Sequence, residues 1–162
     1  PALSDVLDVC KDRIAVNVEI KTEAVDKIIS GGIEERCLKI VEQKGMKKHV
    51  VFSSFDPRAI AHLKQIHETV PVAVLFEKKL YGSRLPSEIV ASLNADAFNC
   101  SKSELNQKWM ADIQSHSIPV NIYTVNDVRN MKKFIHMGVH GIFTNKPDVL
   151  RNVWADLRRL RA

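Results

Sequence analysis

Short apolar runs alternate along the chain with longer segments of helical periodicity. Six runs have the length and the β-branched or aromatic composition of strands, and each but the first is followed within a few residues by a helical pattern. The six predicted strands are Ile14–Ile20, His49–Ser54, Val72–Phe76, Ala97–Cys100, Pro119–Thr124 and Gly141–Thr144. Strands that alternate with helices are typical of an α/β protein with a parallel sheet.

The last third of the chain shows this alternation most clearly. After the strand Pro119–Thr124, Asn126 and Asp127 are residues that start helices, and we interpret Asn126 as the helix cap, although it also lies with Thr124 at a strand end where it could contact a ligand. The apolar positions that follow recur at helical spacing: Val128, Met131, Phe134 and Ile135. Gly138 is predicted to end this helix.

Four sequence motifs occur in a fixed order along nearly the whole chain. They are P-A-L-S-D-V-L at Pro1–Leu7, N-V-E-I-K at Asn17–Lys21, S-S-F-D-P at Ser53–Pro57, and Y-T-V-N followed by G-V-H-G-I-F-T-N-K-P within 123–147. This series resembles the glycerophosphodiester phosphodiesterase family. The family's own motifs are P-T-L-x-E-V-L, N-x-E-I-K, S-S-F-D-P, and W-T-V-N followed by G-V-D-G-I-I-T-D-x-P. Tyr123 therefore stands where the family usually has tryptophan.

The resemblance implies a TIM-like (β/α)8 barrel of the phospholipase-C-like phosphodiesterase type. Such a barrel typically needs about 250 residues, whereas this chain has 162 and six strand candidates. We therefore expect residues 1–162 to form a single domain that lacks its N-terminal part and contains strands three to eight. An N-terminal segment or a partner, including a second copy, would complete the sheet. The alternative is an open six-stranded sheet that binds a nucleotide or phosphate.

The family's catalytic motifs in its first third are missing from this sequence. Neither the H-R-G, E-N-T and E-x-D motifs nor the H-D pair occurs, and no histidine is followed by arginine or aspartate. The resemblance places the general acid and base in those missing histidines, so it assigns no catalytic residue to this chain. We expect metal-dependent hydrolysis of glycerophosphodiesters to an alcohol and glycerol 3-phosphate from the complete domain, and none from this chain alone. The alternative function is a non-catalytic binding or interaction module.

Glu19 and Lys21 carry most of the chemical information in the sequence. Because Glu19 and Lys21 are two residues apart on a strand, their side chains point to the same face. The carboxyl end of a barrel strand opens onto the active site. Without the family context, a structural ion pair is the better interpretation. By resemblance, Glu19 would be a ligand of a divalent cation, Mg²⁺ or Ca²⁺, and Lys21 would contact the substrate phosphate. One carboxylate does not make a metal site.

Two aromatic residues are further candidates for substrate binding. By resemblance, Phe55 would form an apolar wall of the pocket and Tyr123 would line its glycerol side. Equally, Phe55 could be a core residue and Tyr123 an ordinary strand aromatic. Lys78–Arg84 is predicted to be a loop at the rim.

Composition and charge exclude several other classes of protein. Hydrophobic residues make up 45% and charged residues 27% of the chain, and no apolar run approaches the ~20 residues of a membrane helix. The net charge of +5 is spread over separate segments without a nucleic-acid-binding motif. Three distant cysteines, Cys10, Cys37 and Cys100, favour free thiols in a reducing compartment such as the cytoplasm, but localisation stays open.

The C-terminal segment is predicted to be an amphipathic outer helix that opens at Pro147. Its charged face carries several arginines, which a solvated surface explains without a nucleic-acid partner. Its apolar side consists of Leu150, Val153, Trp154, Leu157 and Leu160.

Overall fold

The computed structural model describes residues 1–28 and 30–159. The chain divides into two compact units. The first contains Pro1–Leu75 and Ile89–Asp96, and the second contains Phe76–Glu88 and Ala97–Ala162. Each unit is built from parallel strands that pair with their neighbours in sequence order. Each can therefore be described by itself.

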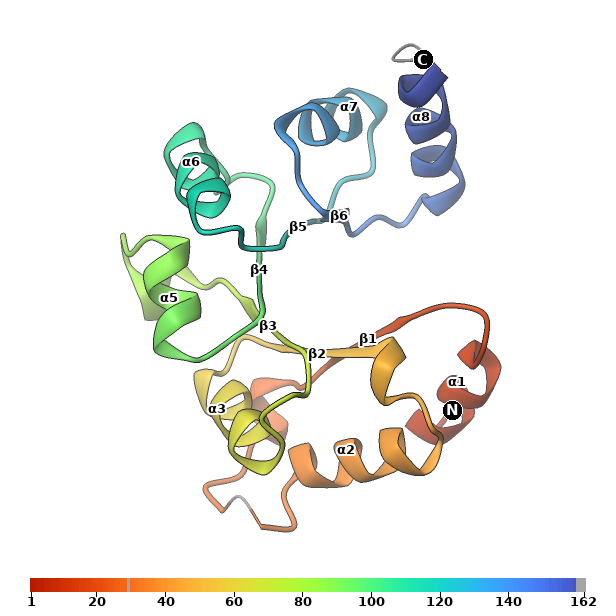
Figure 1. Cartoon of the computed structure of the whole chain (residues 1–162), viewed down its shortest axis with the longest axis vertical. Helices are drawn as coiled ribbons and strands as arrows, with labels where there is room; N and C mark the ends of the chain where they lie inside the picture. Colours follow the sequence, from red (N-terminus) through yellow and green to blue (C-terminus); the bar gives the residue numbers. More distant parts are fainter. Residues whose placement is uncertain (29, 160–162) are drawn as a thin grey trace. The chain divides into compact units, whose positions relative to one another are not determined.

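The first unit has three parallel strands covered by helices. The strands are β1 (Val16–Glu19), β2 (Val50–Ser54) and β3 (Val72–Leu75). The helices are α1 (Leu3–Cys10), α2 (Ile33–Gln43) and α3 (Pro57–Ile66), with 3-10 turns η1 (Thr22–Ala24) and η2 (Lys47–His49). Figure 1 shows α1, α2 and α3 on the same side of β1 and β2. The opposite face of these strands is left for polar residues.

The core of the first unit lies between these helices and strands. Phe52 and Val72 from neighbouring strands are fully buried, as are Leu7, Ile60 and Leu63 from the helices. Because side chains alternate along a strand, only every second residue of a strand points into this core. The burial pattern of β1, in which Val16 and Val18 are half-buried and their neighbours exposed, follows this rule.

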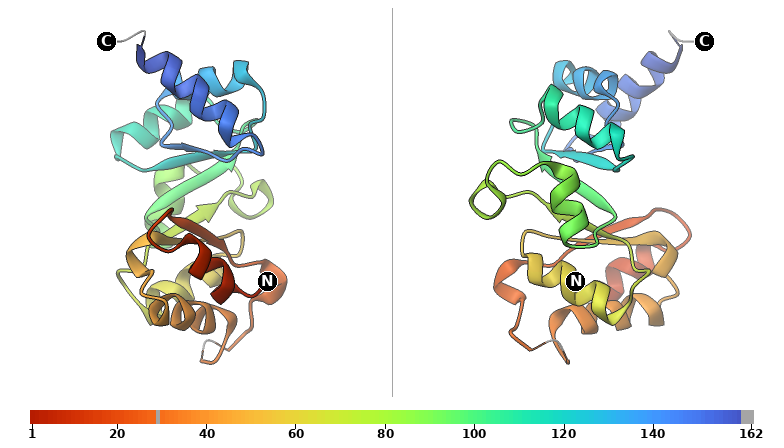
Figure 2. Two further views of the ribbon diagram at one scale, coloured as in Figure 1. Left: turned by 90° about the vertical axis from the view of Figure 1, so that its right-hand side faces the viewer. Right: turned by 60° about the vertical axis from the view of Figure 1, so that its left-hand side comes forward.

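The second unit repeats the same arrangement. Its parallel strands are β4 (Ala97–Ser101), β5 (Val120–Tyr123) and β6 (Gly141–Ile142). Its helices are α4 (Lys78–Tyr81), α6 (Gln107–Ser115), α7 (Val128–Met137) and α8 (Pro147–Arg159), while α5 (Pro86–Ser92) is divided between the units. Figure 2 shows α7 and α8 beside the last strands of the unit. Aromatic rings fill part of the core, since Trp109 meets Phe76 edge-on with 4.8 Å between ring centroids.

The structure confirms the six predicted strands and corrects some local details. The sixth strand, predicted to reach Thr144, ends at Ile142, because the chain then turns and the Thr144 hydroxyl donates to the Asn126 amide oxygen at 3.2 Å. Within the predicted rim loop Lys78–Arg84, the first four residues form the short helix α4. Leu160, predicted to lie on the last helix, falls outside the described residues.

The cap of α7 is also corrected. Asp127, and not Asn126, is the N-cap residue, and its carboxylate accepts the amide hydrogen of Asn130 at 2.9 Å. The predicted end of α7 at Gly138 is confirmed, since this residue has the left-handed conformation with φ of 86°. Aspartate is as good a cap as asparagine, so the sequence alone could not choose between adjacent candidates.

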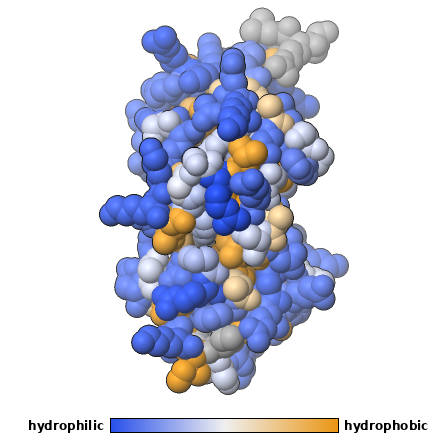
Figure 3. All heavy atoms as spheres, turned by 90° about the vertical axis from the view of Figure 1, so that its left-hand side faces the viewer, coloured by the Kyte–Doolittle hydropathy of each residue, from blue (hydrophilic) through white to orange (hydrophobic). Residues whose placement is uncertain are grey.

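The helices and surfaces agree with the compositional prediction. In the described part of the chain, no helix has the length and hydrophobicity needed to cross a bilayer. Figure 3 shows one face of the molecule, on which hydrophilic side chains predominate. All three cysteines are free thiols, as predicted, and Cys100 is fully buried.

Candidate functional site

The strand face opposite the helices is polar in the first unit. Val16 and Val18 pack against the core, so Asn17 and Glu19 of β1 point to the other face. There the Asn17 amide donates to the Ser53 hydroxyl of β2 at 3.0 Å. Glu19 is the strand neighbour of Ser53 in the parallel register. The polar residues of two adjacent strands thus lie side by side.

Glu19 and Lys21 are in direct contact at the carboxyl end of β1. The Lys21 ammonium lies 2.7 Å from the Glu19 carboxylate, and the side chains are 63% and 32% exposed, respectively. The hydrogen bond and the negative charge of Glu19 raise the pKa of Lys21 above its ordinary value. Lys21 is therefore charged at neutral pH, and both side chains are open to solvent. The predicted proximity of Glu19 and Lys21 is present. Their geometry fits both a structural ion pair and a pair of side chains that binds a ligand.

The end of β2 holds this pair in place. The Ser54 hydroxyl donates to the Ile20 carbonyl at 2.7 Å and accepts the Asp56 amide hydrogen at 3.0 Å. The Ile20 amide in turn donates to the Ser53 carbonyl at 2.8 Å. Because Ile20 lies between Glu19 and Lys21, these bonds fix the backbone that carries them. No local pattern indicates this role of Ser54, because the role depends on which strands are neighbours.

Asp56 connects this strand end to helix α3. Its carboxylate caps the helix by accepting the Arg58 amide hydrogen at 2.9 Å and also forms an ion pair with the Arg58 guanidinium at 2.6 Å. The bond from Arg58 holds the pKa of the Asp56 carboxyl below its usual range. Phe55 lies half-buried between Ser54 and this cap. Its side chain is therefore placed by a backbone that is fixed on both sides.

The described residues do not by themselves form a metal site. Nowhere in residues 1–28 and 30–159 do three histidine, cysteine, aspartate or glutamate side chains gather in a way that could hold an ion. Glu19 contributes one carboxylate, whereas Mg²⁺ and Ca²⁺ require six or more oxygen ligands. A cation at Glu19 would need further ligands from elsewhere.

Tyr123 lies in the second unit, at the carboxyl end of β5. Its hydroxyl donates to the Phe76 carbonyl at 3.2 Å, and its own carbonyl accepts the Lys102 amide hydrogen at 2.8 Å. The side chain is half-buried, and the peptide bond to Thr124 is cis. Asn126 is half-buried, and its amide oxygen also accepts the Asn145 amide hydrogen at 2.8 Å. It thereby holds the loop after β6.

A pair of amides lies on the polar face of the second unit. The Asn121 side chain of β5 donates to the Asn99 side chain of β4 at 2.8 Å, and Asn99 is only 1% exposed. On the other side of Asn121, Gly141 leaves room for its amide, because a Cβ there would lie 2.3 Å from the Asn121 oxygen. No pattern in the sequence indicates a shared role for Asn99, Asn121 and Gly141. Only the strand register brings them together.

Comparisons with known proteins decide the family. The family model described as "Glycerophosphoryl diester phosphodiesterase family" matches residues 1–149. The chain belongs to this family. Among curated members, the glycerophosphodiester phosphodiesterase of Bacillus subtilis is 29% identical over 161 residues, which cover 94% of this chain and 53% of that protein. The enzyme of Caldanaerobacter subterraneus subsp. tengcongensis is 23% identical over 154 residues, covering 94% and 61%.

Solved structures of the family show the same fold. A glycerophosphodiester phosphodiesterase from Parabacteroides distasonis matches with a TM-score of 0.80 and 19% identity, over 98% of this chain and 65% of that one. An Oleispira antarctica phosphodiesterase matches with a TM-score of 0.77 and 18% identity, over 96% and 61%. The chain thus spans between half and two thirds of these relatives. The predicted fold class, a TIM-like α/β protein with six strand–helix units, is confirmed.

Proposed function

We propose that this chain forms the greater part of a single phosphodiesterase domain. The complete domain hydrolyses a glycerophosphodiester to an alcohol and glycerol 3-phosphate. Membership of the family supports the reaction class. The observation that carries the proposal is the pair of Glu19 and Lys21, charged, exposed and in contact at the carboxyl end of β1. The Oleispira antarctica phosphodiesterase, solved in complex with the product sn-glycerol-3-phosphate, supports the choice of product.

The chemistry of a phosphodiester explains the proposed role of Lys21. A diester anion repels nucleophiles, so a cation that neutralises its charge in the transition state lowers the barrier to hydrolysis. Because Glu19 raises the pKa of Lys21, this side chain stays protonated throughout the neutral range and can bind the phosphate. Phe55, half-buried just after the end of β2, binds the remainder of the substrate.

Glu19 supplies one oxygen ligand to a divalent cation, Mg²⁺ or Ca²⁺, in the complete domain. When bound, such an ion adds charge neutralisation at the phosphate. The described residues gather no three His, Cys, Asp or Glu side chains at this point, so a complete ligand set needs further groups. The Glu19 side chain is 32% exposed and reachable from solvent. The contact with Lys21 keeps the carboxylate at the strand end, where both groups can face one phosphate.

This chain provides binding groups but no acid to protonate the leaving alkoxide. Its six histidines lack the H-R and H-D contexts of the family. We therefore expect the 162-residue chain to bind glycerol 3-phosphate weakly and to hydrolyse nothing. The competing proposal, a binding or interaction module, predicts the same for the chain alone. The two proposals differ in what happens once the domain is completed.

The test measures the release of glycerol 3-phosphate from a panel of glycerophosphodiesters, with Mg²⁺ or Ca²⁺. The chain is assayed alone and after fusion to the part of the Bacillus subtilis relative that it does not match. We expect metal-dependent turnover from the fusion only. Lys21→Gln should lower it by roughly 100-fold, the loss typical of removing a transition-state contact. Glu19→Gln should weaken its dependence on the metal.

Two exposed residues provide matched controls for these substitutions. Lys27→Gln and Asp26→Asn make the same charge changes nearby, outside the pair formed by Glu19 and Lys21, and should leave turnover within about twofold. A folded fusion without turnover would favour the non-catalytic module. Equal losses from Lys21→Gln and Lys27→Gln would show that Lys21 acts only through the net charge.

A further inference from the structure

A pocket lies in the second unit between α4 and the start of α6. We call it the α4–α6 pocket, and its volume is about 550 Å³, within the range of small-molecule sites. We propose that this pocket binds an organic phosphate monoester, that is, a small alcohol that carries its own phosphate group. The residues that define the pocket are Phe76, Lys78, Ser83, Ser103, Lys108 and Trp109.

The floor of the pocket is aromatic and firmly held. Phe76 and Trp109 are only 3% and 9% exposed, and their rings meet edge-on. The Phe76 backbone is fixed on both sides, because its amide donates to the Asn99 carbonyl at 2.8 Å and its carbonyl accepts the Tyr123 hydroxyl at 3.2 Å. A preformed apolar surface of this kind suits the carbon part of a ligand.

Two exposed lysines from different helices line the same pocket. Lys78 is the first residue of α4, and Lys108 lies in the first turn of α6, where the helix dipole disfavours a cation unless an anion is bound nearby. In the described part of the chain, neither ammonium group forms an ion pair with a carboxylate. A phosphate monoester carries about −1.5 to −2 charges at pH 7, so one such group matches two lysines.

Other polar groups of the pocket are engaged in holding its walls. The Asn106 side chain accepts the Trp109 amide hydrogen at 3.0 Å and donates to the Glu104 carbonyl at 3.2 Å. The Glu104 carboxylate, which also lines the pocket, accepts the Ser101 amide hydrogen at 3.0 Å. These bonds fix the loop between β4 and α6. The two lysines, in contrast, are available to an anion.

The pocket lies where α/β proteins usually bind ligands. Ser103 follows the carboxyl end of β4, and Tyr123, which is bonded to Phe76, lies at the carboxyl end of β5. Ligands of parallel sheets bind outside the carboxyl ends of the strands. All residues of the pocket belong to the second unit, whereas Glu19 and Lys21 belong to the first. The pocket therefore does not depend on the proposed function.

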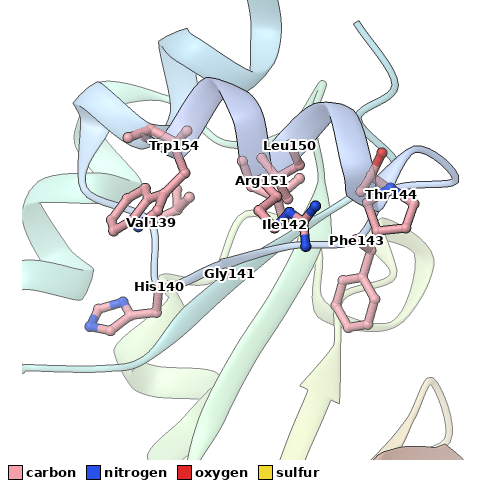
Figure 4. Close-up of a pocket in the computed structure, with 11 residues that line it drawn as sticks. Val139, His140, Gly141, Ile142, Phe143, Thr144, Leu150, Arg151 and Trp154 are labelled. Carbon is pink, nitrogen blue, oxygen red and sulfur yellow. The ribbon is translucent and has the colours of Figure 1, made fainter. Parts of the chain in front are cut away.

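Another hollow of the second unit has a different chemistry. In Figure 4, Leu150, Arg151 and Trp154 come from α8 and lie over β6. Most of the side chains that line this hollow are apolar, and Arg151 is the single lysine or arginine among its described lining residues. A doubly charged phosphate is better matched by the two lysines of the α4–α6 pocket.

The experiment titrates the full 162-residue chain with myo-inositol 1-phosphate, a phosphate monoester of a cyclic alcohol. In a Trp154→Phe background, Trp109 is the only tryptophan, so its emission reports on the floor of the pocket. We expect a saturable change in this emission and a 1:1 complex by calorimetry. Inorganic phosphate lacks the carbon part and myo-inositol lacks the charge, so each should bind about tenfold more weakly.

Matched substitutions make the test specific. Lys78→Gln and Lys108→Gln should each weaken binding about fivefold, the loss expected of one exposed charge contact. Lys79→Gln makes the same charge change on α4 outside the pocket and should leave the affinity within about twofold. Glu104→Gln removes a carboxylate from the pocket but keeps an oxygen for the Ser101 amide, so it should tighten binding. Circular dichroism checks that every variant is folded.

Three results would overturn the proposal. The first is the absence of saturable binding of myo-inositol 1-phosphate. The second is an equal loss from Lys78→Gln and Lys79→Gln, which would show that only the net charge acts. The third is a loss of binding in Lys21→Gln, which would place the ligand at the pair of Glu19 and Lys21 instead of in the α4–α6 pocket.

The phosphate monoester could come from two sources, which turnover by the fusion with the Bacillus subtilis part distinguishes. If it is the alcohol part of a diester substrate, the fusion should hydrolyse glycerophosphoinositol 4-phosphate about tenfold more efficiently than glycerophosphoinositol, and Lys78→Gln should abolish this preference. Equal rates would identify a free organic phosphate as the ligand. A fusion without turnover would refute the proposed function, whereas binding by the 162-residue chain would still support the pocket.

Discussion

Gly141 gives the sharpest test of how the strands of the second unit are packed. A Cβ added there would lie 2.3 Å from the Asn121 side-chain oxygen and 3.2 Å from its carbon. Asn121 cannot move away without cost, because its amide donates to Asn99, which is 1% exposed. Displacing it breaks a hydrogen bond and leaves a buried amide without its partner, a loss of about 1–3 kcal/mol.

The backbone of Gly141 offers an opposing gain. Its φ lies outside the range that L-residues avoid, so alanine at this position should reduce the entropy of the unfolded chain and stabilise by about 0.4–1 kcal/mol. The net expectation for Gly141→Ala is a loss of about 1–2 kcal/mol. With a urea m-value of about 2 kcal/mol/M, the unfolding midpoint should fall by about 0.5–1 M.

A double-mutant cycle with Asn121→Ala tests the cause. Once the Asn121 amide is removed, its Cβ would lie in ordinary contact with the new methyl group, 3.7 Å away. Gly141→Ala should then stabilise the protein by several tenths of a kcal/mol, so the sign of its effect reverses. Equilibrium urea unfolding followed by circular dichroism measures all four variants. An equal loss from Gly141→Ala in both backgrounds would refute the steric argument.

Three further predictions concern buried or charged groups. Arg58 lowers the folded-state pKa of Asp56, so their ion pair should add on the order of 1 kcal/mol to the free energy of unfolding above about pH 4. This contribution should be lost as the pH falls through the lowered pKa. Asp56→Asn keeps the cap but not the charge, so its urea midpoints should depend less on pH between pH 7 and 3. His62→Ala should lower the free energy of unfolding in urea by about 2–3 kcal/mol, because the buried Glu34 carboxylate would lose its 3.1 Å contact with the imidazole. His62→Gln should recover part of this free energy. Equal losses from the two variants would show that the contact is unimportant. Burial raises the pKa of Cys100 to about 12, so mass spectrometry after iodoacetamide treatment at pH 8 should find it unmodified until the chain unfolds, and rapid alkylation of the native protein would contradict this.

The sequence predicted the strands well because their signal is local. Val72–Leu75 and Val120–Tyr123 are short apolar or alternating runs between helical patterns, and the helix end at Gly138 depends on a conformation that glycine favours. The predicted cap of α7 was wrong by one residue, because asparagine and aspartate cap helices equally well. Residue type therefore does not distinguish Asn126 from Asp127. Only the loop that Asn126 binds in the folded protein distinguishes them.

The candidate site was predictable only in part. Glu19 and Lys21 are two residues apart, so their contact follows from strand geometry alone. The role of Ser54 and the amide pair of Asn99 and Asn121 depend on contacts between residues more than 20 positions apart, which no local pattern encodes. The roles of Glu19, Lys21, Phe55 and Tyr123 in substrate or metal binding stay predictions.

The sequence-ordered pairing of strands has a consequence for how the chain folds. Phe52 of β2 pairs with Val72 of β3, and Asn121 of β5 pairs with Gly141 of β6. In each case, the connection between the two strands contains only one helix. Short loops close at little entropic cost, and contacts that are close in sequence speed folding. Each strand–helix repeat can therefore add to the one before it, much as repeats add to the end of a solenoid. A chain of this kind can lose or gain whole repeats during evolution without rethreading those that stay.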